Sequence, residues 1–283
     1  MKNNQLVNTV KKTLSLFSQY EMGVYSGNAS LLILMAMIPL LMLVISAVNM
    51  LPGYSAADSI EFLSRFVPDI PQVQALISNV LENLSRQSGG LIASISALTT
   101  LWSASGGISA IQIGLEKLHG TQRPSLKGKP AALLFTVMYV LLLPSVLVFQ
   151  ILRESIQELI GNALGYLGMD ALARQISAVM QYSGWIVLAA MVIIVILTYA
   201  FLPAGKRTLK SQLPGSLFTC ILWIVFTLCF SYFIPRFWKA SSIYGSLASI
   251  FLMTMWLKFM IMILFYGAAL NKALEVQSDT KEA

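Results

Sequence analysis

The sequence has few charged residues, two cysteines and one histidine. Charged side chains make up 11% of its 283 residues, against roughly 25% in a soluble domain. Cys220 and Cys229 stand nine positions apart in one apolar run, about 13 Å along a helix, too far to form a disulfide with each other. Because His119 is the single histidine, no Cys/His zinc site can be built. We expect neither a metal nor a cofactor.

Motifs for soluble-type catalysis are also missing from the sequence. It contains no nucleophile elbow, no phosphate-binding glycine-rich loop and no pair of carboxylates in a plausible pocket. His119 stands beside Glu116 and Lys117, but without a neighbouring ligand set we interpret it as a loop histidine. We therefore expect that the chain is not an enzyme.

Long apolar runs fill the sequence instead. Hydrophobic residues make up 57% of the chain, its mean hydropathy is +0.74, and six runs are each long enough to cross a membrane as a helix. The runs are 28–50, 90–113, 130–152, 184–202, 213–234 and 245–270. The sequence predicts an all-α polytopic membrane protein, with residues 1–283 as one six-helix domain.

The positions of the basic residues predict the orientation of these spans. Twelve of the 19 Lys and Arg residues lie on the side of the two termini, six lie on the other side, and Lys258 lies inside a span. Because basic loops stay in the cytoplasm, both termini should be cytoplasmic. The net charge of +7 then reflects topology, and we expect no nucleic-acid partner.

Amphipathic segments are predicted between and before the spans. Residues 72–86 and 156–180 place apolar side chains at helical spacing in the two outer loops. The amino terminus, 1–27, does so with Leu6, Val10, Leu14 and Phe17, and its lysines would meet anionic headgroups. Residues 271–283 are predicted to form a cytoplasmic tail.

Lys258 is the most informative residue, because it lies near the middle of the sixth predicted span. A cation at that depth costs roughly 2.5–3.5 kcal/mol, and no carboxylate lies centrally in any span. Its partners are therefore either hydroxyls and carbonyls of the bundle or the anionic group of a substrate. The sequence leaves both alternatives open.

The second predicted span has one small and weakly polar face. Close helix packing is the default interpretation of such a face, and the lining of a polar path is the alternative. A homodimer through this face also stays open. The residues that would line a substrate path are Lys258, Ser96, Thr99, Thr100, Ser103, Trp102, Pro39 and Tyr244.

Several local motifs follow one another along the chain. The first predicted span contains Ala29 and the run 38–41 (IPLL), and the second contains 101–107 (LWSASGG). The third motif comprises 199–203, Lys206, Arg207, Pro214 and Gly215, and the last comprises 244–247, Trp256 and 267–271. In order and spacing these motifs resemble the YihY/BrkB family of bacterial inner-membrane proteins, once mislabelled ribonuclease BN.

The resemblance covers nearly the whole chain and implies six helices in a bacterial inner membrane. For relatives it suggests export of lipids or other amphiphiles, or ion antiport. Two positions depart from the family pattern. Ala269 stands where the pattern often has glutamate, and Lys258 stands where a neutral or aromatic residue is expected.

Two functional hypotheses follow from the sequence. The first is a transporter or flippase-like exporter of an amphiphilic, anionic substrate, with Lys258 as the headgroup contact and membrane lipids as partners. The second is a non-transporting scaffold that organises lipid or recruits proteins at the envelope. A membrane nuclease is the weakest alternative, because spans occupy the positions where nuclease ligands would be needed.

Overall fold

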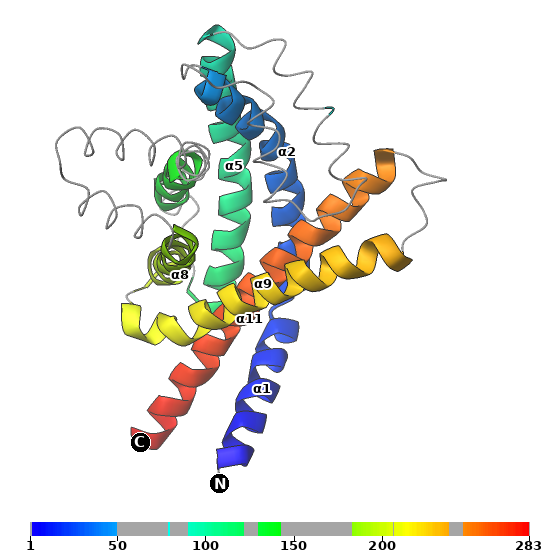
Figure 1. Ribbon diagram of the computed structural model, residues 1–283. Coiled ribbons are helices and arrows are strands. Elements are labelled where there is room, and N and C mark those ends of the chain that lie inside the picture. The colour runs from blue at the N-terminus through cyan, green and yellow to red at the C-terminus, as the bar shows by residue number, and fades with distance from the viewer. Residues whose placement is uncertain are drawn as a thin grey trace, which may run out of the picture.

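The computed structural model describes residues 2–49, 79, 90–121, 130–142, 183–205, 207–237 and 246–282. Every regular element in this described part is a helix (Figure 1). The helices are α1 (Lys2–Gln19), α2 (Met22–Asn49), α5 (Gly90–His119), α8 (Ser183–Phe201), α9 (Leu209–Phe237), α11 (Ser246–Glu282) and a further helix, Pro130–Leu142. The all-α prediction is confirmed.

Each of the six predicted apolar runs overlaps one of these helices. By length and apolar composition, two segments are clear candidates to cross a membrane: Leu209–Ile234 in α9 and Ile250–Gln277 in α11. Three shorter apolar helices, Met22–Met37, Pro130–Leu142 and Val187–Phe201, accompany them. The number of crossings therefore stays a prediction.

The two ends of the chain lie at the same end of the molecule (Figure 1). The rings of Phe17 on α1 and Tyr266 on α11 stack with centroids 3.9 Å apart. Farther along, the Thr9 hydroxyl donates to the side-chain oxygen of Gln277 at 3.2 Å. The amino-terminal helix α1 thus packs against the last helix, α11, and is part of the bundle.

The amino terminus is helical, as predicted, and α1 has both a buried and an exposed side. Thr13, Leu16 and Phe17 are buried, whereas Val10 and Leu14 are exposed. The reason is that α1 packs on α11 through its Phe17 side, and this contact decides which face is covered. The prediction that the apolar side chains of this helix pack at the membrane interface stays a prediction.

The small residues of α5 allow close contact with α2 and α11. A Cβ on Gly107 would lie 2.6 Å from the Cγ1 of Ile33, and one on Gly114 would lie 2.6 Å from the ring of Phe265. Both distances are shorter than real Cβ contacts, so a larger residue at either position would force Ile33 or Phe265 to shift. For Gly107 and Gly114 the packing interpretation of the small face is confirmed.

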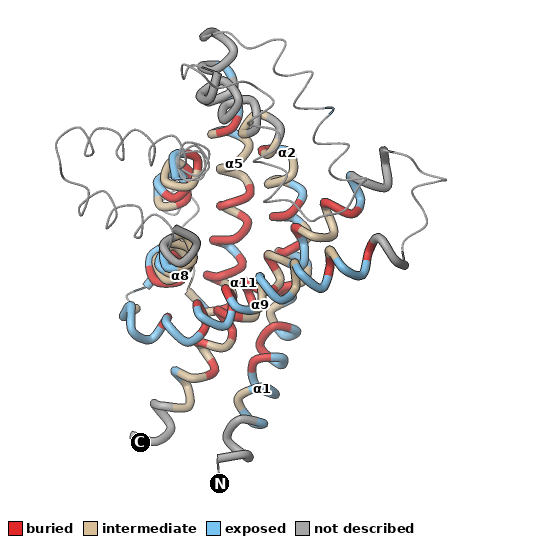
Figure 2. The backbone as a smooth tube through the Cα atoms, viewed as in Figure 1, coloured by how far each residue is buried: buried red, intermediate tan, exposed pale blue. Residues whose placement is uncertain are grey.

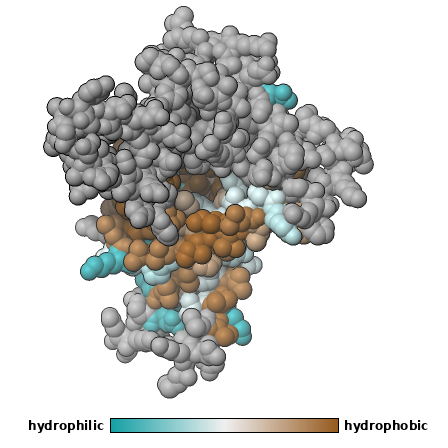
Figure 3. Space-filling view, in the orientation of Figure 1, coloured by the Kyte–Doolittle hydropathy of each residue, from teal (hydrophilic) through white to brown (hydrophobic). Residues whose placement is uncertain are grey.

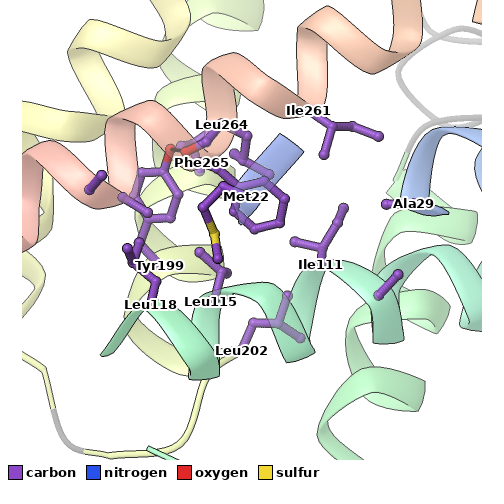
Figure 4. Close-up of a cluster of buried hydrophobic side chains, with 14 of the residues drawn as sticks. Met22, Ala29, Ile111, Leu115, Leu118, Tyr199, Leu202, Ile261, Leu264 and Phe265 are labelled. Atoms are coloured by element: carbon purple, nitrogen blue, oxygen red, sulfur yellow. Dashed lines mark hydrogen bonds between the residues drawn. The ribbon is translucent and has the colours of Figure 1, made fainter. Parts of the chain in front are cut away.

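One buried cluster joins α2, α5, α8 and α11 (Figure 4). Met22, Leu115, Tyr199 and Phe265 are fully buried at its centre. The cluster lies near the end of the bundle that carries both termini, because Met22 and Leu115 lie at the terminal turns of α2 and α5. This end of the bundle is its packed core.

Helix α9 exposes most of its apolar surface. Only 22% of its apolar window is buried, and pale blue segments run along its length in Figure 2. An apolar band crosses the same part of the space-filling view (Figure 3). A core helix of a soluble protein would be largely buried, and a soluble surface rarely carries such a band. Its exposed residues include Leu213, Leu217, Ile221, Ile224, Val225, Leu228 and Phe233.

The predicted amphipathic segments of the outer loops, 72–86 and 156–180, lie outside the described residues, apart from Asn79, which is helical. The predicted tail 271–283 is not a separate segment at its start, because α11 continues as a helix to Glu282. Its first residue, Asn271, is buried.

Candidate functional site

Helices α9 and α11 meet at two glycines. A Cβ on Gly215 would overlap the carbonyl oxygen of Gly267 and approach the Oδ1 of Asn271 to 2.5 Å. A Cβ on Gly267 would overlap Thr219 and lie 2.6 Å from the Tyr199 hydroxyl. Because no side chain separates the two backbones here, polar groups bridge them directly.

Asn271 forms the first bridge. Its Oδ1 accepts a hydrogen bond from the Gly215 amide at 2.7 Å, and its Nδ2 donates to the main-chain and side-chain oxygens of Gln212 at 3.2 and 3.1 Å. All three residues are buried. Hydrogen bonds in such a low-dielectric setting fix the register of the two helices.

Tyr199 of α8 forms the second bridge. Its hydroxyl donates a hydrogen bond to the Leu264 carbonyl at 2.6 Å. The same oxygen accepts a hydrogen bond from the Thr219 hydroxyl at 2.7 Å. One phenol therefore links α8, α9 and α11. We call Gln212, Gly215, Thr219, Tyr199, Gly267 and Asn271 the polar seam. The seam holds the second half of α11 rigidly.

The first half of α11 is arranged differently. Phe265 is fully buried against α5, yet Lys258, seven residues earlier, is exposed. Residues seven apart lie on the same side of a helix. Phe251, a further seven residues back, is 54% exposed. The face of α11 that is packed at Phe265 is therefore open at Lys258.

Apolar side chains surround Lys258 on this open face. Phe259 is partly exposed, with its ring centroid 5.2 Å from that of Phe226 on α9. Ile250 and Phe251 are exposed on the preceding turns. Among the described residues, the cation Lys258 thus lies beside several exposed apolar side chains, which suits a ligand with an anionic head and an apolar body.

The predicted path residues on α5 whose side chains are described do not share one face of the helix. Thr100 is buried and Ser103 is partly buried, whereas Thr99 is exposed and Trp102 is 86% exposed. Trp102 and Thr99 therefore point away from the packed side of α5. The prediction of a path through these residues stays a prediction.

Three predicted path residues remain. Pro39 is partly buried inside α2, which continues through it to Asn49. Ser96 lies in α5, but its side chain is outside the described residues, as is Tyr244. The prediction that these three residues line a path with Lys258 stays a prediction.

The sequence interpretation missed the polar seam and misplaced His119. The seam coincides with the motifs around Pro214, Gly215 and 267–271, which carried the family resemblance. Those motifs are the sequence feature from which the seam could have been predicted. His119 is not in a loop: it is the last residue of α5, and its Nδ1 lies 2.8 Å from the Leu115 carbonyl. Its signal was Gly120, a residue type that often ends a helix.

Within the described ranges no group of three His, Cys, Asp or Glu side chains is placed to hold a metal ion. The polar seam is a buried helix junction, and Lys258 is exposed on the preceding part of α11.

Comparison with known proteins agrees with the motifs. The family model described as virulence factor BrkB matches residues 13–283. The chain is similar to the ribonuclease-like protein YfkH of Bacillus subtilis (strain 168), with 23% identity over 276 residues and 94% of each chain covered. No solved structure matches the chain. The chain therefore belongs to the virulence factor BrkB family and is a membrane protein with apolar helices.

Proposed function

We propose that the chain crosses a bacterial inner membrane six times, with both termini in the cytoplasm. The common end of α1 and α11 supports an even number of crossings. Helix α5 has 30 residues, about 45 Å at 1.5 Å per residue, more than the roughly 30 Å of a hydrocarbon core. The excess of basic residues beside the termini supports their cytoplasmic location.

We further propose that the protein is a flippase-like exporter of an anionic, lipid-like amphiphile. The observation that carries this proposal is the exposed Lys258 on an apolar face of α11. The headgroup of the amphiphile would contact the ammonium group, and its apolar part would lie along Phe251 and Ile250. Its partners would be membrane lipids and not nucleic acids.

Lys258 with an anionic ligand bound is energetically more favourable than Lys258 without one. A lysine near the membrane centre costs roughly 2.5–3.5 kcal/mol, and an ammonium can reach water only by extending its stem toward an interface. Lys258 stands twelve residues after the start of α11, about 18 Å along the axis. A phosphate or carboxylate brought to this face would offset the cost by a charge-assisted hydrogen bond.

Movement of labelled lipid in proteoliposomes tests the proposal. The purified full-length chain is reconstituted with fluorescent phosphatidylglycerol or phosphatidylcholine, and an impermeant reductant reports which leaflet holds the label. We expect the protein to speed movement of the anionic probe. Lys258→Ala should remove most of this activity, and Lys258→Arg should keep it.

Lys210→Ala is the matched control, because Lys210 is an exposed lysine in the first turn of α9. It should leave the movement unchanged. Equal movement of both probes, or full activity in Lys258→Ala, contradicts the proposal. Failure of Lys258→Ala to accumulate in the membrane would instead assign Lys258 a structural role.

A scaffold without transport is the second candidate. The polar seam favours it, since close backbone contact and buried hydrogen bonds resist the helix movements that transport needs. If the native chain and Lys258→Ala both fold and neither moves either lipid probe, the result supports the scaffold.

The name of YfkH suggests ribonuclease activity, but we propose no enzymatic activity for this chain. Metal-dependent RNA cleavage generally uses a bound metal to activate water. Incubation of the purified chain with RNA and Mg²⁺ tests this directly. Cleavage that copurifies with the folded protein would reverse the proposal.

A further inference from the structure

The end of α5 is shaped by a glycine turn. Gly120 has a φ of 69°, its amide donates to the Lys117 carbonyl at 3.1 Å, and the Thr121 amide donates to the Glu116 carbonyl at 2.9 Å. These two bonds form a Schellman cap. The cap folds Thr121 back over the helix end, beside His119.

Two cations from other elements converge on this helix end. Lys272 of α11 donates to the Leu118 carbonyl, and its Nζ lies 4.9 Å from the centre of the Tyr20 ring. Arg207, just before α9, donates to the Ala204 carbonyl at 3.0 Å. Its guanidinium and the Thr121 methyl group both lie within 3.8 Å of the position that a Cβ on Gly205 would take.

Two cations lie at the negative end of α5. The carbonyls at the end of a helix are equivalent to roughly half a negative charge, whereas Arg207 and Lys272 bring two full positive charges. The charged groups that act on His119 are these same two cations. The acid on the preceding turn, Glu116, accepts a hydrogen bond from the Gln112 amide at 3.1 Å. Lys117 pairs with Glu21 instead.

Within the part of the chain that the structure describes, two polar atoms of the cluster are buried and have no hydrogen-bond partner. They are the Nε2 of His119 and the hydroxyl oxygen of Thr121. A buried polar atom left in this state costs about 1–3 kcal/mol, and in folded proteins a bound ion can supply the missing bond. Gly120 and Gly205 are exposed beside the cluster, so solvent reaches its edge.

We infer that His119, Thr121, Arg207 and Lys272 form a binding site for a phosphate group. Arg207 and Lys272 supply charge, and the Thr121 hydroxyl donates a hydrogen bond. Because His119 Nδ1–H already donates to Leu115, Nε2 bonds to an anion only when it takes up a proton from solvent. Phosphate binding is therefore coupled to protonation of His119.

The depth of the site points to a phospholipid headgroup as one source of the phosphate. His119 lies six residues beyond Ile113, where the predicted second span ends, which is about 9 Å along the helix. Basic pockets between helices at that level bind anionic lipid headgroups. Free phosphate has the same chemistry. This site lies 14 residues from Lys258 on α11, about 21 Å, and does not rest on the proposed export.

The single histidine provides a direct test. The full-length chain, labelled with [¹³C]histidine, gives one ring signal, because His119 is the only histidine. Its pH titration is recorded in phosphatidylcholine nanodiscs, in the same nanodiscs with inorganic phosphate, and in nanodiscs that contain phosphatidylglycerol. Burial, with Arg207 and Lys272 adding to it, lowers the pKa of His119 to about 4.

We expect bound phosphate to raise this pKa by about one unit or more, a tenfold or larger coupling. A response to inorganic phosphate identifies a free-anion site. A response only to phosphatidylglycerol identifies a headgroup site. No response to either, in folded protein, overturns the inference and leaves the cations as a helix cap.

Three variants control for folding and for general surface charge. Arg207→Gln and Thr121→Val should each weaken the response at least tenfold, and Thr121→Val changes shape least if Arg207→Gln fails to fold. Lys117→Gln is the matched control, because Lys117 lies on the same helix but pairs with Glu21. An equal loss in Lys117→Gln and Arg207→Gln also overturns the inference.

Discussion

Lys258 and Phe265 lie on the same face of α11, two turns apart, but Phe265 is fully buried and Lys258 is exposed. The face of α11 that is packed at Phe265 is thus exposed at Lys258, although Leu252 and Leu257 are buried on other sides of the helix. Beyond Phe265, toward the carboxyl end, the polar seam and the glycine contacts hold α11 against α9 and α5. The exposed face of α11 carries the cation.

The contact at Gly267 gives the first prediction. Gly267→Ala should lower the free energy of unfolding by about 1–3 kcal/mol or more, because its Cβ would overlap Thr219 and crowd the Tyr199 hydroxyl. Thermal unfolding in detergent measures the loss.

Gly27→Ala is the control for this change. Nothing lies within 4 Å of a Cβ at Gly27 in α2, so alanine should be neutral or add about 0.5–1 kcal/mol through helix propensity. Equal melting temperatures for the two variants would show that α9 and α11 are not in close contact.

Asn271 gives the second prediction. Asn271→Ala removes the bonds to Gly215 and Gln212 and leaves buried polar groups without partners, so we expect a loss of about 2–3 kcal/mol. Asn28→Ala, at an exposed position of α2, should change little. Unfolding in denaturant compares them. If both variants unfold at the native midpoint, the seam does not hold the helices.

The two cysteines give the third prediction. Cys229 is exposed on α9 and Cys220 is buried. A spin label should therefore attach at Cys229 and leave Cys220 largely unmodified. If α9 faces lipid, collisions of that label with oxygen should be frequent, and collisions with a water-soluble nickel complex should be rare. The reverse ranking would place this face of α9 in water.

The pH dependence of stability gives the fourth prediction. Burial and two neighbouring cations lower the pKa of His119 from 6.5 to about 4. Between these values the unfolded chain binds the proton and the folded chain does not, so stability falls as the pH drops from 6.5 to 4. The contribution is on the order of 2–3 kcal/mol.

His119→Asn isolates this effect, because asparagine keeps a donor near the Leu115 carbonyl but does not titrate. In buffers without phosphate, the native chain should lose melting temperature relative to the variant as the pH falls through this window. A difference in melting temperature that stays constant from pH 7 to 4 would show that folding does not lower the pKa of His119.

The helices could be predicted from sequence because long apolar runs require them in a membrane. The ends of the helices could not be predicted, because a helix can continue into polar residues where these bond to residues far away in the sequence. Helix α11 passes beyond its apolar run since Asn271 bonds to Gly215 and Gln212. A single sequence does not reveal which helices meet, so the seam was visible only as separate motifs.

The site was predicted in part for the same reason. Lys258 stood out because of its depth, but its exposure depends on which faces of α11 the other helices cover. Thr99 and Trp102 share a sequence window with Thr100, yet the helical twist turns them to other sides. His119 was misplaced because Gly120 was not recognised as the end of a helix.

The central claim is that Lys258 contacts an anionic headgroup on an open apolar face. Cryo-electron microscopy of the full-length chain in phosphatidylglycerol nanodiscs tests it most directly. We expect headgroup density at hydrogen-bond distance from Nζ, about 2.7–2.9 Å, and its loss in Lys258→Ala. A lysine bonded only to protein groups, with α11 packed along its whole length, would contradict the claim.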